Sequence, residues 1–431
     1  MSPTVKVGLL GCGIVGGATA RILIEHASDL SLRAGTDLEI ARIAVRSLAK
    51  EREVSLPPEK WTTDPWEVVN DPDIDVVVEA IGGIEPAKDL ILAALKNKKH
   101  VVTANKELLS TLGKEVMDAA EEAGVDLLFE ASVAGGIPII RPMKESLAGD
   151  RVRRVMGLVN GTTNFILTRM SETGESFAES LAEAERLGYT EMDPSADIEG
   201  YDAAAKLAIL ASLAFNARVV ASDVEREGIS AVKASDIVAA HELGYEIKLL
   251  AVAEIDEGQV AARVHPSMVP KNHPLAAVRD VFNAVFVESQ ESGELMFYGR
   301  GAGGGPTGSA VVGDLVEVAR NIVSGGRSAG CTCYHSRAKI RPHDETRVRY
   351  YVVLSVLDQP GVLSTVAGVF ANHDVSIASV RQEGAGDEAT LALITHLATE
   401  GQHGQTFSDL AKLDSVKEIT SRLRVEGTGE E

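Results

Sequence analysis

The segment 188–206, GYTEMDPSADIEGYDAAAK, gathers acidic side chains just ahead of a single lysine. The charged residues are Glu191, Asp193, Asp197, Glu199, Asp202 and Lys206. The first part is rich in Gly, Pro, Asp and Ser, which favour turns and caps, whereas YDAAAKLAILASLAF from Tyr201 onward is typical of a helix. Asp202 and Lys206 would then lie one turn apart on one helix face. Such a pair is either an ordinary surface contact or a lysine held ready to exchange protons.

The bulk composition of the 431-residue chain limits the classes of partner. With 42 Lys and Arg against 63 Asp and Glu, the net charge is −21. This balance argues against nucleic acid or an anionic membrane as the main partner. The start lacks the basic leader of a signal peptide, and no apolar run reaches the ~20 residues of a membrane span. We therefore expect a cytoplasmic protein.

The three cysteines do not form a disulfide framework in a chain of this size. Cys12 lies among glycines, and Cys331 and Cys333 are spaced too closely for a usual zinc half-site. The expected state is reduced thiols, with a redox role for the Cys331/Cys333 pair as the alternative.

A glycine-rich turn near the N-terminus predicts a dinucleotide site. The apolar run VKVGLL (5–10) leads into GCGIVG and a helical stretch, which places GxGxxG between a strand and a helix. The free N–H groups at that helix start suit a pyrophosphate. Further strands are expected at 38–45, 74–83, 100–105 and 126–132, and helices at 86–97 and 107–123. The candidate cofactor residues in the turn are Gly11, Gly13, Ile14, Val15 and Gly16.

This alternation of strands and helices predicts an α/β protein whose residues 1–137 form a Rossmann-type doubly wound domain. Where an NAD-preferring site commonly has an acid after the second strand, this chain has Arg46, Ser47 and Lys50. A guanidinium and a hydroxyl suit a 2′-phosphate. We therefore expect NADP, with NAD as the alternative.

The rest of the chain predicts two more units and a returning segment. Residues 138–299 mix helices with strands and a hairpin turning at Ser292-Gly293, as in an α+β domain, which we expect to carry the substrate site on one face. The glycine-rich stretch from Arg300 leads into an apolar helix, which we expect to rejoin the nucleotide domain over about 300–325, with Gly303 over the cofactor. A charged connector, 336–348, which we expect to be solvated, precedes a βαββαβ pattern at 349–425.

Residues 184–206 resemble the signature of homoserine dehydrogenases at Ala184, Gly188, Asp193-Pro194, Asp197, Gly200, Asp202 and Lys206. Other family segments follow in order: TANKELL (103–109), EASVAGGIPII (130–140), NGTTNFIL (160–167) and GRGAGGGPTGSAVVGDL (299–315). Because the nucleotide fold starts within ten residues of Met1, the resemblance is to the monofunctional form. It implies reversible oxidation of L-homoserine to L-aspartate 4-semialdehyde with NAD(P), in threonine, methionine and isoleucine biosynthesis.

The resemblance also implies roles for individual residues. Lys206 corresponds to the general acid/base, and Lys106 to a second cation near the nicotinamide and the reacting oxygen. Glu191 and Asp202 would hold the substrate's ammonium and hydroxyl, while Asp197 would order the loop and contact the substrate or Lys206. Thr103, Gly188 and Gly303 would line the cofactor.

The resemblance further implies a monovalent cation, sodium by expectation, at the turn EASVAGGIPII. The ligands would be the Glu130 carboxylate and the backbone carbonyls of Val133, Gly135 and Ile137. Hard cations prefer oxygen ligands, so the residues permit the site. The alternative is a plain glycine turn at the end of a strand.

The segment 349–425 resembles an ACT domain, a module that binds amino acids where such domains pair. The resemblance to homoserine dehydrogenases implies L-threonine as a feedback effector. It also implies that residues 138–299 are a substrate-binding and dimerisation domain, whose sheet assembles a homodimer or homotetramer. The effector residues would be Asp358, Gly361, Val362, Leu363 and Asn372. An ACT domain that serves only as an assembly surface is the alternative.

Two other hypotheses for the function of the whole chain stay open at this point. One is a dehydrogenase of another amino-acid semialdehyde. The other is a non-catalytic sensor of a dinucleotide and an amino acid, in which Lys206, Asp202, Glu191 and Lys106 would have no chemical task.

Overall fold

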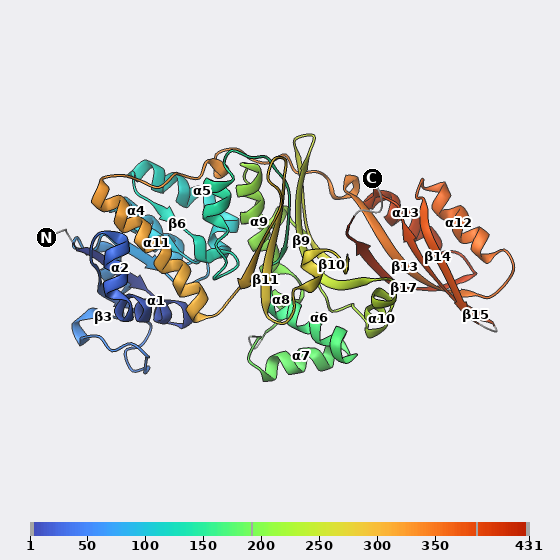
Figure 1. Ribbon diagram of the computed structural model, residues 1–431, viewed down its shortest axis with the longest axis horizontal. Coiled ribbons are helices and arrows are strands. Elements are labelled where there is room, and N and C mark those ends of the chain that lie inside the picture. Colours follow the sequence, from blue (N-terminus) through green and yellow to red (C-terminus); the bar gives the residue numbers. More distant parts are fainter. Residues whose placement is uncertain (1–3, 191–192, 385–386, 428–431) are drawn as a thin grey trace.

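The N-terminal unit of the computed structural model is a six-stranded, all-parallel sheet (Figure 1). The structure describes residues 4–190, 193–384 and 387–427. The strand order is β3-β2-β1-β4-β5-β6. The strands are β1 (Val5–Leu10), β2 (Leu38–Ala44), β3 (Trp61–Thr62), β4 (Val76–Glu79), β5 (His100–Thr103) and β6 (Leu127–Leu128). This order, reversing between β1 and β4, is that of a doubly wound dinucleotide-binding sheet and confirms the predicted fold class.

Six helices cover this sheet: α1 (Ile14–Glu25), α2 (Ala27–Ala34), α3 (Pro65–Asn70), α4 (Ala87–Lys96), α5 (Lys106–Ala123) and α11 (Gly304–Ser324). The strands β1 and β4 are almost wholly buried, as expected for strands covered on both faces. The sequence did not predict β3 and α3. Their short, mixed-polarity segments lack the periodicity that identifies longer elements.

The helix α11 returns to the first unit from far along the chain and packs against α1. Two glycines of α11 allow the close approach, because a Cβ on Gly304 would lie 3.1 Å from Ile14 O, and one on Gly308 would lie 3.0 Å from Thr19 N. The two helices therefore begin side by side, next to the turn that follows β1 (Figure 1).

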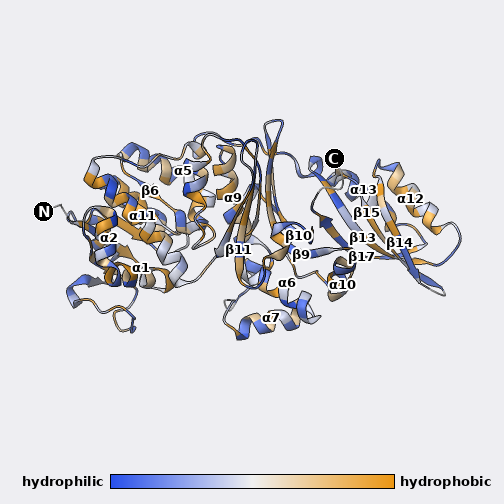
Figure 2. Ribbon diagram, viewed as in Figure 1, coloured by the Kyte–Doolittle hydropathy of each residue, from blue (hydrophilic) through white to orange (hydrophobic). Residues whose placement is uncertain are grey.

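The central unit has strands β7 (Val152–Leu158), β8 (Glu225–Arg226), β9 (Tyr245–Asp256), β10 (Gln259–Pro270), β11 (Phe282–Ser289) and β12 (Gly293–Arg300). Its helices are α6 (Gly161–Thr173), α7 (Phe177–Arg186), α8 (Ser195–Ile198), α9 (Tyr201–Phe215) and α10 (Ala234–Glu242). The helix α9 is mostly hydrophobic along its length (Figure 2) and lies between α5 and the central sheet. A helix that is apolar on most sides is expected to be buried in this way.

The C-terminal unit has the βαββαβ order of an ACT domain, with one extra short strand, β16 (Ala398–Thr399). It comprises β13 (Arg347–Leu357), α12 (Val362–Asn372), β14 (Ile377–Gly384), β15 (Glu388–Thr395), α13 (Glu400–Leu410) and β17 (Val416–Val425). Parallel pairing of β17 with β10, at Ser267 with Arg424 and Met268 with Val425, joins this sheet to the central one. The path β12-β11-β7-β9-β10-β17-β13-β15-β14 is therefore one continuous sheet.

One expectation about the cysteines is wrong, and the course of the connector was not predicted. The segment after α11 runs along the central unit, since Arg218 N donates to Ser336 O at 2.7 Å and Arg341 N donates to Val260 O at 2.8 Å, while its charged residues Arg337, Lys339 and Glu345 are exposed as expected. Cys331 and Cys333, expected as free thiols, form a disulfide. The local spacing gave no sign of either feature, because both depend on how the connector lies on the folded chain. None of the described helices is long and apolar enough to cross a membrane.

Candidate active site

The acidic segment leads into α9 through a sharp turn. Gly200 adopts a left-handed conformation (φ 79°) directly before the helix, which glycine does without steric cost. Asp202 then lies in the first turn of α9, where the helix dipole favours a carboxylate. Lys206 follows one turn later on the same face, and both side chains are largely buried, with 9% and 12% exposure. The predicted pair is therefore an interior one and not a surface contact.

Asp202 holds two lysines from two structural units. One carboxylate oxygen, Oδ2, lies 2.7 Å from Lys206 Nζ, and the other, Oδ1, lies 2.9 Å from Lys106 Nζ. Lys106 is the first residue of α5, just beyond the carboxyl end of β5. Open α/β sheets bind ligands at that edge. The structure thus brings together the two lysines that the sequence singled out.

Fixed acceptors orient the ammonium group of Lys206. Its Nζ donates to the carbonyl of Val159 at 2.7 Å as well as to Asp202. An ammonium has three N–H bonds, so beyond these two partners in the described part of the chain one remains for a reacting oxygen. Burial alone would raise the pKa of Asp202, but the neighbouring Lys206 and Lys106 outweigh it and hold that pKa well below its usual range. Asp202 is therefore a permanent anion at working pH.

Asn160 connects Asp202 to Asp197. The amide nitrogen Nδ2 lies 2.6 Å from Asp197 Oδ1 and 2.9 Å from Asp202 Oδ2. Burial, together with the charge of Asp202, raises the pKa of Asp197, against which the Asn160 bond acts. Sequence reasoning missed Asn160, although an asparagine directly before a helical stretch was a visible capping signal. The predicted Glu191 lies outside the described residues.

The turn after β1 has the shape that a pyrophosphate requires. Gly11 adopts φ +100°, and a Cβ there would lie 2.9 Å from Ala80 O, while a Cβ on Gly16 would collide with Gly11 O. A Cβ on Gly13 would meet nothing within 4 Å, so this side of the turn is open. No side chain caps the start of α1, and Ile14 is exposed while Val15 is partly buried. Gly303 (φ +111°) precedes α11 at the same place.

The other predicted cofactor residues fall into three positions. Arg46 and Ser47 are exposed just beyond the end of β2. The Thr103 hydroxyl at the end of β5 is buried and donates to Glu79 Oε2 at 2.6 Å. Gly188 (φ +73°) follows α7 and leads into the acidic segment. Glu79 also accepts hydrogen bonds from Ile81 N and Gly82 N, and these bonds fix the loop after β4. This role of Glu79 was not predicted from the sequence.

The turn that follows β6 has features that suit a hard cation. The Glu130 carboxylate accepts N–H bonds from Ile139, Ile140 and Arg141, which uses three of its four acceptor positions. Among the described residues, no backbone N–H is donated to the carbonyls of Val133, Gly135 and Ile137. The turn packs on Gly301, where a Cβ on Gly135 would collide with the backbone. The described chain has no cluster of three or more His, Cys, Asp and Glu for a metal.

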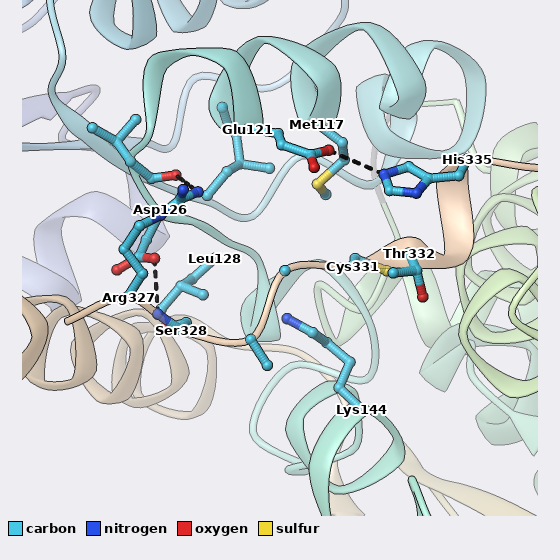
Figure 3. A pocket seen from close by; sticks show the side chains of 15 residues that line it. Met117, Glu121, Asp126, Leu128, Lys144, Arg327, Ser328, Cys331, Thr332 and His335 are labelled. Atoms are coloured by element: carbon cyan, nitrogen blue, oxygen red, sulfur yellow. Dashed lines mark hydrogen bonds and ion pairs between the residues drawn. The ribbon is translucent and has the colours of Figure 1, made fainter.

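Among the cavities away from this site, one lies beside Cys331 and another at the start of α12. The first, of about 270 Å³, is lined by the end of α5 remote from Lys106, with the side chain of Lys144 reaching into it beside Cys331 (Figure 3). Burial lowers the pKa of Lys144. The second, of about 350 Å³, is lined by Asp358, Gly361, Val362 and Leu363, among others. Asn372 is the last residue of α12 and does not line that cavity.

Comparison with protein families matches residues 11–130 to the homoserine dehydrogenase NAD-binding domain, 138–316 to homoserine dehydrogenase and 350–415 to the ACT domain. The homoserine dehydrogenase of Mycobacterium tuberculosis is 52% identical over 99% of this chain and 98% of its own length. That of Corynebacterium glutamicum is 49% identical over 98% and 96%.

Solved structures of homoserine dehydrogenases are also similar to this chain. The homoserine dehydrogenase from Thiobacillus denitrificans aligns with a TM-score of 0.93 at 41% identity, covering 98% of each chain. A hyperthermophilic archaeal homoserine dehydrogenase in complex with NADPH aligns over 73% of this chain and 98% of its own, with a TM-score of 0.62 at 29% identity. The chain therefore belongs to the homoserine dehydrogenase family of oxidoreductases, with an NAD-binding domain, a central domain and a C-terminal ACT domain.

Proposed function

We propose that this homoserine dehydrogenase interconverts L-homoserine and L-aspartate 4-semialdehyde with Lys206 as general acid/base and NADP as the preferred cofactor, in threonine, methionine and isoleucine biosynthesis. The observation that supports this most strongly is the pair of lysines from two units held on the two oxygens of Asp202. A structural ion pair needs one lysine, whereas two cations at the ligand-binding edge of the sheet suit a reacting oxygen.

In the direction of aldehyde reduction, Lys206 acts as the acid. Two of its N–H bonds are directed to Val159 O and Asp202, so the third gives a proton to the aldehyde oxygen. The bound dinucleotide supplies or accepts the hydride at the neighbouring carbon. In the oxidative direction Lys206 takes the alcohol proton, and alkaline conditions favour this direction because it releases a proton.

Lys106 and the acidic residues orient the substrate. Lys106 places a second positive charge beside the oxygen that gains electron density. Three donors, from Lys206, Lys106 and Asn160, use three of the four acceptor positions of Asp202, which leaves one for the substrate. Asp202 would thus position both lysines and, with Glu191 and Asp197 from the segment before α9, hold the substrate's ammonium and hydroxyl.

The cofactor proposal rests on the end of β2. Arg46 and Ser47 are exposed there, without an acid to bind a ribose 2′-hydroxyl. The archaeal relative in complex with NADPH supports the same preference. We expect Arg46→Ala to raise KM for NADP by about tenfold, the scale of a charge-assisted bond, and to leave KM for NAD nearly unchanged. Arg21→Ala, which removes an exposed arginine paired with Glu25 on α1, is the control. Equal losses with both cofactors would contradict the 2′-phosphate role.

Sodium at the Glu130 turn would hold the turn against the returning segment. Glu130, Val133, Gly135 and Ile137 would supply oxygen ligands, and the contact of Gly135 with Gly301 makes the turn a link between the units. Stability measured in sodium and in tetramethylammonium chloride at equal ionic strength tests this role. We expect a higher unfolding free energy in sodium chloride, and equal unfolding free energies in the two salts would contradict a bound sodium ion.

The cavity at the start of α12 supports regulation by L-threonine. Gly361 (φ 95°) leaves the helix N-terminus uncapped by any side chain, and free N–H groups there suit an amino-acid carboxylate. Asn372, at the other end of α12, would contribute from a second copy. Inhibition of turnover by L-threonine but not D-threonine is expected, and no inhibition would leave the domain as an assembly surface.

A homodimer or homotetramer is part of the proposal, as is a cytoplasmic location. The strand β12 ends the long sheet and exposes Met296 and Tyr298, the kind of edge that a second copy covers. Light scattering after gel filtration would report the mass of the assembly. A monomer at assay concentration would contradict the proposed homo-oligomer.

The activity itself is tested by the initial rise in NAD(P)H absorbance with L-homoserine and either NADP+ or NAD+. Turnover with a higher kcat/KM for NADP+ is the expected result. If folded protein showed no turnover of L-homoserine with either cofactor, the result would favour a dehydrogenase of another semialdehyde or a non-catalytic sensor.

A further inference from the structure

We propose that Asn160 is a positioning residue for this reaction: its amide clamps Asp197 and Asp202 together, and so sets the carboxylate that receives the substrate's ammonium beside the lysine that carries the proton. The proposal rests on the proposed function, because it assigns a task to a residue of the same site.

The first step is the orientation of the amide. Asn160 is the N-cap of α6, and its oxygen Oδ1 accepts a bond from Thr163 N at 2.9 Å and from the Thr163 hydroxyl at 3.0 Å. The cap therefore consumes the acceptor end of the side chain, and the donor end must point away from α6. The hydrogen-bond network thus fixes which end of the amide faces the carboxylates.

The second step is that both N–H bonds of the amide have anionic partners. One is directed to Asp197 Oδ1 at 2.6 Å, and the other to Asp202 Oδ2 at 2.9 Å. Asn160 is itself only 6% exposed. Asp202 is buried and Asp197 is partly buried. Their charges repel one another, and a neutral group that donates to both at once offsets that repulsion without adding a charge.

The third step is that the neighbouring backbone also holds the proton carrier. The carbonyl of Val159, the residue before Asn160, accepts a bond from Lys206 Nζ. The start of α6 therefore touches Asp197, Asp202 and Lys206 within two consecutive residues. A displacement of this helix start would move the substrate anchor and the proton carrier together.

No other capping residue reproduces this arrangement. Aspartate and serine both cap helices well, but aspartate has no donor, and serine is too short to reach two carboxylates. A role confined to capping would tolerate either residue. A role as a clamp would tolerate neither, which separates the two explanations by experiment.

The clamp predicts a change in pH dependence with a definite sign. Among the described residues, the charged groups that face Asp197 are Asp202 and Lys206 of α9, whereas the start of α6 faces it with the uncharged Asn160 and Thr162. Burial and Asp202 raise the pKa of Asp197, and the Asn160 bond lowers it. Loss of the amide raises this pKa further, so that Asp197 is charged only at higher pH. The acid limb of kcat/KM for homoserine then moves upward in pH.

The test compares Asn160→Ser and Asn160→Asp with the unmodified enzyme, across pH, with homoserine and NADP+. Both variants should raise KM for homoserine by about tenfold or more, the scale of a bond to a charged group. The acid limb should move upward, and further in Asn160→Asp, which adds a third carboxylate. KM for NADP+ should stay unchanged. Asp64→Ser, an N-cap exchange on α3 where Asp64 bonds Trp66 N, is the control and should alter none of these kinetic values.

Unchanged KM and pH profile in both variants would overturn the proposal and leave Asn160 as a helix cap. Calorimetric titration of homoserine into the unmodified enzyme and Asn160→Ser at two pH values provides a readout that does not need turnover. Lower affinity in the variant, most marked at acid pH, supports the clamp, and equal affinity overturns it. Absence of turnover by the unmodified enzyme would count against the proposed function alone.

Discussion

At the scale of single residues, the surroundings of each carboxyl group decide what it does. Asp202 is buried between two ammonium groups, which keep its pKa low. The pKa of Asp197, one amide away, is raised by partial burial and by the charge of Asp202. Another carboxyl, the buried Asp314 of α11, accepts bonds from Arg141 and Glu130 N, yet burial and the Glu130 charge raise its pKa to about 8. Side chains of one type thus differ in charge state according to their surroundings.

The raised pKa of Asp314 predicts how stability varies with pH. The folded state binds a proton more tightly than the unfolded chain, whose aspartate titrates near 3.8. This contribution to stability is complete below about pH 4 and is lost as the pH rises to about 8. The unfolding free energy, measured in urea from pH 4 to 9, should therefore fall more steeply in the unmodified enzyme than in Asp314→Asn. Parallel curves of unfolding free energy against pH for the two proteins would contradict a raised pKa of Asp314.

At the scale of elements, the site depends on how closely helices approach one another. The N-termini of α1 and α11 lie side by side because glycines of α11 allow it, and two helix N-termini together provide more N–H donors for a pyrophosphate than one. The first turns of α5 and α9 also meet, here through the ion pair between Lys106 and Asp202. The helices, rather than flexible loops, therefore set the geometry of the reacting groups.

Gly308→Ala tests the contact between α1 and α11. The new Cβ would lie 3.0 Å from Ala18 Cβ and Thr19 N, so the helices must separate slightly. We expect a loss of ~1–3 kcal/mol in unfolding free energy, the usual cost of overpacking, and a higher KM for NADP+. Gly313→Ala on the same helix meets nothing within 4 Å and should be neutral or stabilising by up to ~1 kcal/mol. Similar effects of the two substitutions would argue against a specific close approach.

At the scale of the whole molecule, one sheet runs from the substrate domain into the ACT domain. Only two residue pairs join β10 to β17, but buried charges strengthen the junction. Glu426, directly after β17, lies 2.5 Å from Arg154 of β7, and its backbone N–H donates to Met268 O at 2.9 Å. The helix α12, which lines the proposed effector cavity, thus belongs to a domain that shares backbone hydrogen bonds with the central unit.

Glu426→Gln should weaken this junction. It leaves Arg154, whose side chain is 21% exposed, without its closest anion, and breaking one side of a largely buried pair costs up to ~3–5 kcal/mol. Glu288→Gln removes a more exposed partner of the same arginine, 3.7 Å away, and should cost less than ~1 kcal/mol. Urea unfolding of both variants checks the ranking; equal losses would mean that the junction charges are not held as a buried pair.

The features that sequence reasoning predicted are local ones. GxGxxG after a strand, the pair Asp202 and Lys206 on one helix turn, and the βαββαβ pattern each fall within a short span, so spacing alone expresses them. The pairing of Lys106 with Asp202, the clamp at Asn160 and the joining of β10 to β17 depend on segments far apart in the chain. Such contacts follow from packing, which one sequence does not encode in any local pattern.

The most direct test of the central claim is kcat for aspartate 4-semialdehyde reduction by Lys206→Ala, with the KM for NADPH measured alongside. If Lys206 gives the proton, kcat falls by about 10²–10⁴, the range for loss of a general acid, while the cofactor KM stays nearly unchanged. A variant that binds NADPH normally and keeps most of its kcat would show that the proton comes from another group, and that the lysines on Asp202 serve only to hold the two units together.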